Sequence, residues 1–140
     1  ESTKKMKMKR VVIYADGASL GNPGPSAIGA TIKDEQGKLL ARISQRIGRA
    51  TNNQAEYRAI IAALEKAINL GAKHVKVNSD SELVVRQING KYRVKKATLK
   101  PLYQEVKKLQ SLLESFTITH ISRWQNTEAD NLANKALKIV

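Results

Sequence analysis

The 140-residue sequence contains no cysteine, only two histidines and a single tryptophan. The absence of cysteine excludes a disulfide framework, a thiolate nucleophile and a zinc site built on thiolates. It also fits a reducing compartment, and we expect the protein to be cytoplasmic. Because His74 and His120 are the only imidazoles, a bound metal ion must be held mainly by oxygen. Such ligands favour Mg²⁺, with Mn²⁺ as the alternative.

The chain also lacks an apolar run of roughly 18 residues, so we expect no transmembrane helix and no membrane partner. Its length suits one domain with a substantial core. The sequence contains no internal repeat, low-complexity tract or domain boundary. We therefore expect residues 10–140 to form a single domain, residues 1–9 to form a disordered basic arm, and the protein to be a monomer.

Acidic residues are scarce, with 12 Asp and Glu against 25 Lys and Arg, a formal net charge of +13 and a pI of about 10.1. A surplus of this size indicates a polyanionic partner, bound in a salt-dependent way. Nucleic acid is one candidate, and a generic basic protein is the alternative. The basic residues are densest at 91–96, within a basic segment at 86–108 that has one acid, Glu105.

Hydrophobic periodicity predicts an α/β fold with the order β-β-β-α-β-α-α-β-α. The expected strands are 10–15, 27–33, 39–47, 75–78 and 116–122, and the expected helices are 51–71, 80–90, 99–113 and 128–137. The glycine- and proline-rich residues 16–25 predict a loop. Short turns join the first three strands into an antiparallel meander, whereas helical connections imply parallel crossovers. The sequence therefore predicts a five-stranded mixed sheet with helices on both faces.

Four acids, Asp16, Glu56, Asp80 and Asp130, follow predicted strands or begin predicted helices. Each has an ordinary structural alternative: Asp16 suits a hairpin turn, Asp80 a helix N-cap, and the other two the first turn of a helix. However, the spacing of Glu56 places it on an inward-facing stripe, where an unpaired acid is costly. Four such acids on a basic protein favour divalent metal ions acting on a phosphate backbone.

Four segments together resemble type 1 ribonuclease H: DGASLGNPGP at 16–25, TNNQAEY at 51–57, DSELVVRQ at 80–87 and EADNLA at 128–133. They occur in the family's order and at suitable distances, and the resemblance covers about residues 11–137. It implies the ribonuclease H-like fold and an endonuclease that hydrolyses the RNA strand of RNA–DNA hybrids. Cleavage is then expected to leave a 5′-phosphate and a 3′-hydroxyl.

The resemblance also implies that the four acids hold two Mg²⁺ ions, which in such sites lie about 4 Å apart. Asp16 would bridge the ions, and Asp130 would help hold the ion that activates the attacking water. Glu56 and Asp80 would help hold the ion that stabilises the leaving oxygen. Glu56 is also a candidate contact for a 2′-hydroxyl of the RNA.

Substrate contacts are implied at a further set of positions: Gly17, Ser19, Asn22, Thr51, Asn52, Asn53 and Gln87. Ser19 and Asn22 match positions that touch the RNA strand, whereas Thr51 and Asn52 match a pocket for a phosphate of the DNA strand. Asn53 and Gln87 are expected in the groove. The alternatives are a turn former for Asn22 and a helix-surface residue for Gln87.

The sequence departs from the family pattern at three places. The histidine that many relatives carry before the last acid is missing, and Arg123 is the candidate in its place. An arginine cannot exchange a proton at neutral pH, so we expect an electrostatic role. His120 falls within a predicted strand and is expected to be structural.

The long basic handle of some relatives is absent, and Glu82 replaces a frequent glutamine. Cleavage of double-stranded RNA and a non-catalytic hybrid-binding module therefore remain alternatives.

Overall fold

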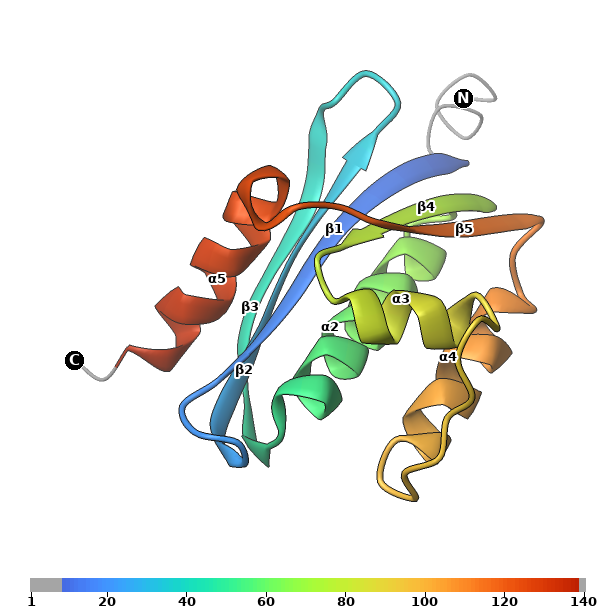
Figure 1. Ribbon diagram of the computed structural model, residues 1–140. Helices are drawn as coiled ribbons and strands as arrows, with labels where there is room; N and C mark the ends of the chain where they lie inside the picture. Colours follow the sequence, from blue (N-terminus) through green and yellow to red (C-terminus); the bar gives the residue numbers. More distant parts are fainter. Residues whose placement is uncertain (1–8, 139–140) are drawn as a thin grey trace.

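The computed structural model describes residues 9–138 of the chain (Figure 1). Its elements are β1 (Arg10–Ser19), β2 (Gly24–Asp34), β3 (Leu39–Ala50), α2 (Asn52–Asn69), β4 (His74–Ser79), α3 (Glu82–Ile88), α4 (Lys100–Gln110), β5 (Ser115–His120), the single 3₁₀ turn η1 (Arg123–Asn126) and α5 (Thr127–Leu137). The predicted α/β class and order of elements are confirmed. The turn η1 is an addition that hydrophobic periodicity does not reveal.

The five strands form one mixed sheet in the order β3-β2-β1-β4-β5. The first three strands pair antiparallel because short turns connect them, and β4 and β5 join in parallel through helical connections. Strand β1 therefore lies at the centre of the sheet. Its inward side chains Val11, Ile13 and Ala15 are almost fully buried.

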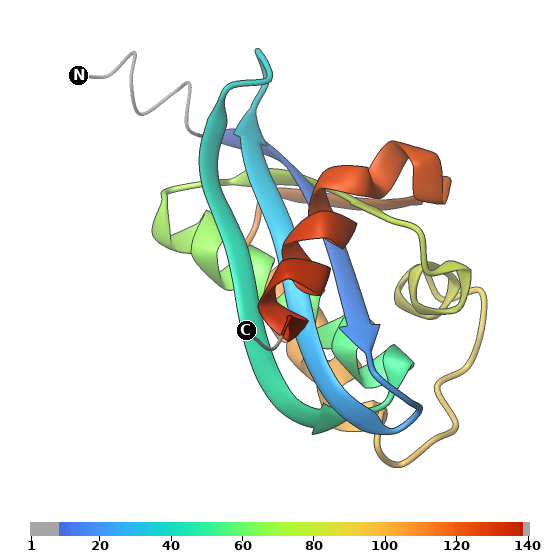
Figure 2. The same ribbon diagram turned by 90° about the vertical axis from the view of Figure 1, so that its left-hand side faces the viewer.

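Helices cover both faces of the sheet, as predicted. Helix α5 packs on one face over β1, β2 and β3, and Figure 2 looks onto that face. Helix α2 packs on the opposite face against β1 and β2, with α4 beside it (Figure 1). The side of α2 turned to the core consists of buried residues at helical spacing: Ala55, Tyr57, Ala59, Ile60, Ala63, Leu64 and Ala67.

The predicted loop over residues 16–25 is confirmed only for residues 20–23 and is wrong for the residues on either side. Strand β1 continues through Asp16 to Ser19. The Cα partner of Asp16 on β2 is Gly29, and that of Ser19 is Ser26. The connecting turn is short and is closed by a hydrogen bond from the Leu20 N–H to the Pro25 carbonyl, at 2.8 Å. Backbone pairing with β2 outweighs the turn preference of Asp and Gly, because it satisfies backbone polar groups of residues 16–19 along that side.

Several boundaries also differ from the predictions. Helix α4 ends at Gln110, and β5 ends at His120 because η1 begins soon after it. Of the predicted arm, residues 1–8 lie outside the described residues. Lys9 belongs to the fold, since its carbonyl accepts hydrogen bonds from the N–H groups of Lys73 and His74 at 2.7 and 2.8 Å. Among the described residues, the helices are too short or too polar to cross a membrane.

Candidate active site

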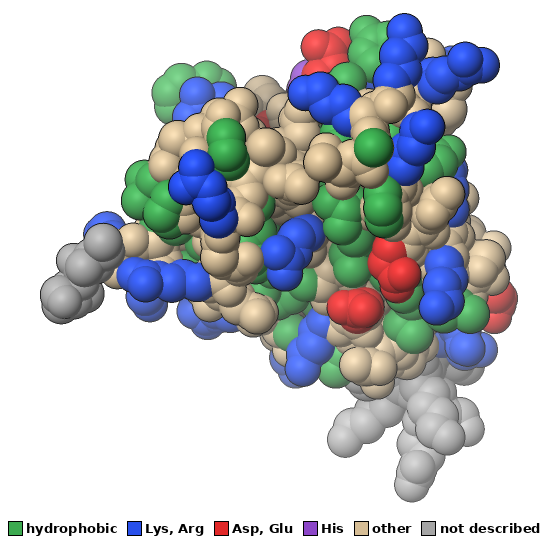
Figure 3. Space-filling model, turned by 90° about the horizontal axis from the view of Figure 1, so that it is seen from below, with side chains coloured by type: hydrophobic (Ala, Val, Ile, Leu, Met, Phe, Trp, Pro, Cys, Tyr) green, Lys and Arg blue, Asp and Glu red, His purple; other side chains and the backbone are tan. Residues whose placement is uncertain are grey.

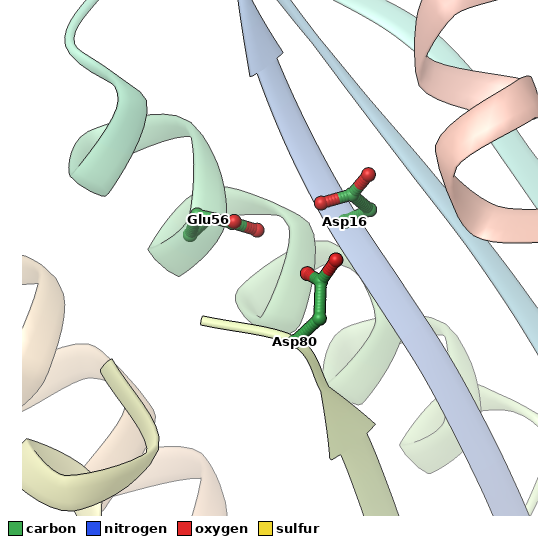
Figure 4. Close-up of side chains that lie close together, drawn as sticks. All are labelled: Asp16, Glu56 and Asp80. Atoms are coloured by element: carbon green, nitrogen blue, oxygen red, sulfur yellow. The ribbon is translucent and has the colours of Figure 1, made fainter. Parts of the chain in front are cut away.

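Three carboxylates from separate elements meet at one place. Asp16 comes from β1, Glu56 from the second turn of α2, and Asp80 from the residue after β4 (Figure 4). One carboxylate oxygen of each residue lies within 4.8 Å of those of the other two. The three acids are thus close enough to hold one cation jointly.

The parallel pairing of β1 and β4 brings Asp80 beside Asp16. Ala15 is the Cα partner of Ser79, so each strand places its acid one residue further along in the same direction. Parallel sheets commonly place functional groups at this edge, beyond the carboxyl ends of the strands. Asp80 follows the last residue of β4, whereas Asp16 lies within β1, which continues to Ser19.

A glycine allows α2 to bring Glu56 against β1. A Cβ atom at Gly17 would lie 2.3 Å from the backbone carbon of Ala55 and 2.5 Å from the backbone nitrogen of Glu56. Any larger residue would therefore displace the helix. The close approach lets the Gly17 N–H donate a hydrogen bond to Oε1 of Glu56, at 2.8 Å, which orients that carboxylate.

The fourth acid, Asp130, arrives from the opposite face of the sheet. Helix α5 packs closely on β2 at Gly29, where a Cβ atom would lie 2.2 Å from the carbonyl oxygen of Ala129. Gly29 is the Cα partner of Asp16, so this contact brings the first turn of α5 next to Asp16. Asp130 is consequently among the groups that raise the pKa of Asp16.

The acids line an open hollow of about 400 Å³. Its lining residues are Asp16, Gly17, Asn52, Glu56, Asp80, Arg123 and Asp130. All seven are among the functional residues that the sequence predicts. The structure therefore brings the four acids, Arg123 and two of the predicted substrate contacts together in one place.

Burial and mutual repulsion make this acidic cluster unfavourable without a counter-charge. Burial is the main cause of the raised pKa of Asp16, and the neighbouring Glu56, Asp80 and Asp130 raise it further. Burial also raises the pKa of Glu56, an effect that the Gly17 N–H partly offsets. A cluster of oxygen donors that resists ionisation suits a hard divalent cation, which would stabilise the charged carboxylates.

Four predicted substrate contacts lie beside the hollow, around the β1–β2 turn and the start of α2. Asn22 accepts a hydrogen bond through Oδ1 from the Asn52 N–H, at 3.0 Å. Ser19 donates to the Ala50 carbonyl at 3.0 Å, and Thr51 caps α2 by accepting from the Gln54 N–H at 3.2 Å. Asn53 lies half-buried in the first turn of α2. These hydrogen bonds fix the turn against the helix.

Gln87 is buried and does not line the hollow. Its side chain is only 5% exposed, and Oε1 accepts a hydrogen bond from the Tyr57 hydroxyl at 2.7 Å. The alternative that Gln87 is a helix-surface residue is therefore wrong, and the structure gives it a packing role between α2 and α3. His120 is exposed at the end of β5 and does not line the hollow.

Sequence reasoning missed Asn126, the last residue of η1. It is 1% exposed, and Nδ2 donates to the Ala15 carbonyl at 2.9 Å. This hydrogen bond fixes the start of α5 to the strand residue that precedes Asp16. An asparagine before a helix is also an ordinary capping residue, so the sequence offered no signal that separated the two roles.

Basic side chains are spread over the surface of the protein (Figure 3). Figure 3 shows Lys and Arg side chains scattered over the face seen from below, with few acidic side chains among them. The connection between α3 and α4 contributes a series of exposed basic residues: Lys91, Arg93, Lys95 and Lys96. This distribution suits a polyanion that lies across the surface and places one phosphate at the acidic hollow.

Comparison with known proteins identifies the family. The model of a family described as reverse transcriptase-like matches residues 14–136. The chain is 46% identical to the bifunctional protein Rv2228c of Mycobacterium tuberculosis and 43% identical to ribonuclease HI of Halobacterium salinarum, each over 91% of this chain. It spans only 35% and 64% of those two relatives. Ribonuclease H of Anaplasma marginale is 36% identical, with 91% of this chain and 90% of that protein covered.

Solved structures agree with these relatives. The N-terminal RNase H domain of Rv2228c superimposes with a TM-score of 0.90 at 45% identity, covering 92% of this chain and 99% of that one. LC11-RNase H1 in complex with an RNA/DNA hybrid gives 0.87 at 42% identity, covering 91% and 96%. The fold, the order of the sequence motifs and these likenesses agree, and the chain belongs to the ribonuclease H family.

Proposed function

We propose that this protein is a metal-dependent endonuclease that hydrolyses the RNA strand of RNA–DNA hybrids, acting as a monomer. The observation that carries the proposal is the convergence of Asp16, Glu56, Asp80 and Asp130 in one hollow of a strongly basic protein. The similarity to LC11-RNase H1, whose structure holds an RNA/DNA hybrid, supports the choice of substrate.

The four carboxylates are the proposed ligands of two Mg²⁺ ions, with Mn²⁺ as a substitute. The donor set fits, because it consists of oxygens, is partly buried and repels itself when ionised. Asp16 interacts with the other three acids, which supports a bridging role. Metal ions bound there would supply an activated water and stabilise charge on the phosphate during in-line displacement, leaving a 5′-phosphate and a 3′-hydroxyl.

The protein's own groups orient the acids and the substrate. The Gly17 N–H holds Glu56 in place through its hydrogen bond to Oε1, so this carboxylate need not reorganise during the reaction. The backbone at Asn52 begins α2, and the N-terminus of an 18-residue helix favours an anion such as a phosphate of the DNA strand. Arg123 supplies a permanent positive charge at the hollow and stabilises a phosphate without exchanging a proton.

Selection of RNA is expected to depend on the 2′-hydroxyls. These groups are displayed across the wide, shallow minor groove of an A-like helix. Glu56 is the candidate acceptor for one of them. At the β1–β2 turn, Ser19 and Asn22 are the proposed further contacts with the RNA strand. At the start of α2, Thr51 and Asn53 are the remaining proposed substrate contacts.

The test is cleavage of a hybrid labelled separately on each strand, with Mg²⁺, with Mn²⁺ and with chelator. We expect cutting of the RNA strand only, and loss of more than about 100-fold in Glu56→Gln, since electrostatic groups of this kind contribute that much. Glu65→Gln is the matched control, because it removes an exposed acid from the same helix. It should cleave like the native protein.

The same assay separates the alternatives. Cutting of an RNA duplex at a rate near that of the hybrid would establish the broader nuclease. Hybrid binding without cleavage under any metal condition would overturn the enzyme proposal and leave a non-catalytic binding module. A DNA duplex of the same sequence serves as the negative substrate.

A further inference from the structure

The chain's only tryptophan, Trp124, lies in η1 and is 87% exposed, the largest exposed fraction among the large hydrophobic side chains of the described region. Single exposed apolar residues are ordinary at protein surfaces, so exposure by itself indicates nothing. The position of Trp124 is more informative than its exposure. The turn η1 connects β5, at the edge of the sheet, to α5, the helix that carries Asp130.

The turn that holds Trp124 is fixed at both ends. At its start, the backbone N–H and the hydroxyl of Ser122 both donate to Oε1 of Gln125, at 3.1 and 3.2 Å. At its end, buried Asn126 donates to the Ala15 carbonyl, one residue before Asp16. The indole is therefore carried on a backbone whose position is set relative to the catalytic strand.

Trp124 also follows directly after Arg123, which lines the acidic hollow. Successive side chains on a 3₁₀ turn diverge by about 120°, so the guanidinium and the indole cannot point the same way. Arg123 lines the hollow, and the indole of the next residue extends into solvent in another direction, free of protein contacts that would bury it. A strand that places its phosphate at the hollow has to pass close to the turn that carries both residues, because Arg123 lines that hollow.

We infer that Trp124 is a specificity-determining contact of the substrate, and that its indole packs against the sugars and base edges next to the scissile phosphate. This inference rests on the proposed function. An indole offers a large, rigid apolar surface with one N–H donor, which suits sugar faces and groove edges. The bases of a duplex are already stacked on each other, so the shallow minor groove of a hybrid is the surface open to it.

Because Trp124 is the only indole, its fluorescence reports on this contact alone. The experiment uses Asp16→Asn protein, which on the proposed function should bind the hybrid without cutting it. Excitation at the red edge of indole absorption avoids the four tyrosines. Hybrid is added while its binding is followed independently by the anisotropy of an end-labelled strand. We expect the indole emission to change and acrylamide quenching to fall, with the same midpoint as the anisotropy.

A second arm measures kinetics of variants in the active background. Trp124→Ala should raise KM for the hybrid at least several-fold with a small change in kcat, and Trp124→Phe should recover most of the loss. Leu112→Ala is the control, because Leu112 is also exposed, at 59%, but precedes β5 at the end of the sheet opposite to Asp80. It should match the native protein.

The outcomes are distinct for the two proposals. Indole emission and quenching that stay constant while anisotropy reports bound hybrid would overturn the contact at Trp124 and leave the nuclease intact. An unchanged KM in Trp124→Ala would likewise overturn the contact at Trp124 without affecting the proposed nuclease function. Absence of both hybrid binding and cleavage in the native protein would overturn the proposed function, and with it this inference.

Discussion

Asn126 donates a hydrogen bond from Nδ2 to the carbonyl oxygen of Ala15, at 2.9 Å, and so joins the start of α5 to the centre of the sheet. The two residues are 111 positions apart in the chain. Because Asp16 follows Ala15 and Asp130 lies one turn after Asn126, this single contact bears on the relative position of two of the four acids.

Replacing Asn126 by alanine should therefore lower both stability and activity. The buried Ala15 carbonyl loses its side-chain donor, a loss of about 1–3 kcal/mol in the free energy of unfolding. Thermal unfolding and hybrid cleavage measure the two effects. Asn131→Ala is the control, because Asn131 is an exposed residue of α5, and this variant should stay within about 0.5 kcal/mol of the native protein. An Asn126→Ala protein with native kcat and Tm would contradict the role of this contact.

Asp16→Asn should stabilise the metal-free protein at neutral pH. The pKa of Asp16 is raised in the folded state, so folded protein binds more protons than unfolded protein at pH values above about 4. Stability of the native protein must then fall as pH rises through this range. We expect Asp16→Asn to increase the free energy of unfolding by about 1–2 kcal/mol near neutral pH, which corresponds to a Tm increase of several degrees.

Thermal unfolding in chelator across the pH range measures this effect. The difference in Tm between the two proteins should shrink as the pH falls to about 4 and below, where the Asp16 carboxyl becomes protonated in the unfolded as well as the folded state. Addition of Mg²⁺ should raise the Tm of the native protein more than that of Asp16→Asn, since a ligand that binds only the folded state stabilises it. A metal-free Asp16→Asn protein that is less stable than the native one at every pH would refute this account of the cluster.

Gly17→Ala should disrupt the site by displacing α2. The new Cβ atom would lie 2.3 Å from the backbone of Ala55, a clash that side-chain movement cannot relieve. We expect a loss of about 1–3 kcal/mol or more in stability, together with loss of cleavage. Gly37→Ala offers a comparison, because Gly37 has a positive φ of 85° but open space around it. Only backbone strain, about 1 kcal/mol, should follow there, with activity retained.

Tyr57→Phe tests the role of Gln87. The Tyr57 hydroxyl donates to Oε1 of Gln87 inside the protein, and its removal leaves a buried acceptor without that partner. We expect a loss of about 1–3 kcal/mol in the free energy of unfolding and an unchanged Kd for the hybrid. Denaturant unfolding and anisotropy measure the two quantities. A large change in Kd at native stability would instead favour the predicted groove contact of Gln87.

The order of elements and the acidic residues could be predicted from the sequence because both depend on local patterns. Apolar spacing distinguishes strands from helices, and short turns or long connections decide antiparallel or parallel pairing. Asp16, Glu56, Asp80 and Asp130 occur in motifs that resemble one family, so their candidacy did not require knowing where they lie. The charge of +13 likewise predicts a polyanionic partner from composition alone.

What the tertiary structure decided depends on contacts between distant segments. Residues 16–19 carry turn-forming Asp and Gly, yet they form a strand, because β2 pairs with their backbone. Gln87 has a polar side chain of the kind that is common on helix surfaces, yet it is buried against Tyr57. Asn126 had no distinguishing local pattern, and its role arises only when α5 folds back onto β1. Propensity is set by neighbours in the chain, whereas burial and hydrogen-bond partners are set by neighbours in space.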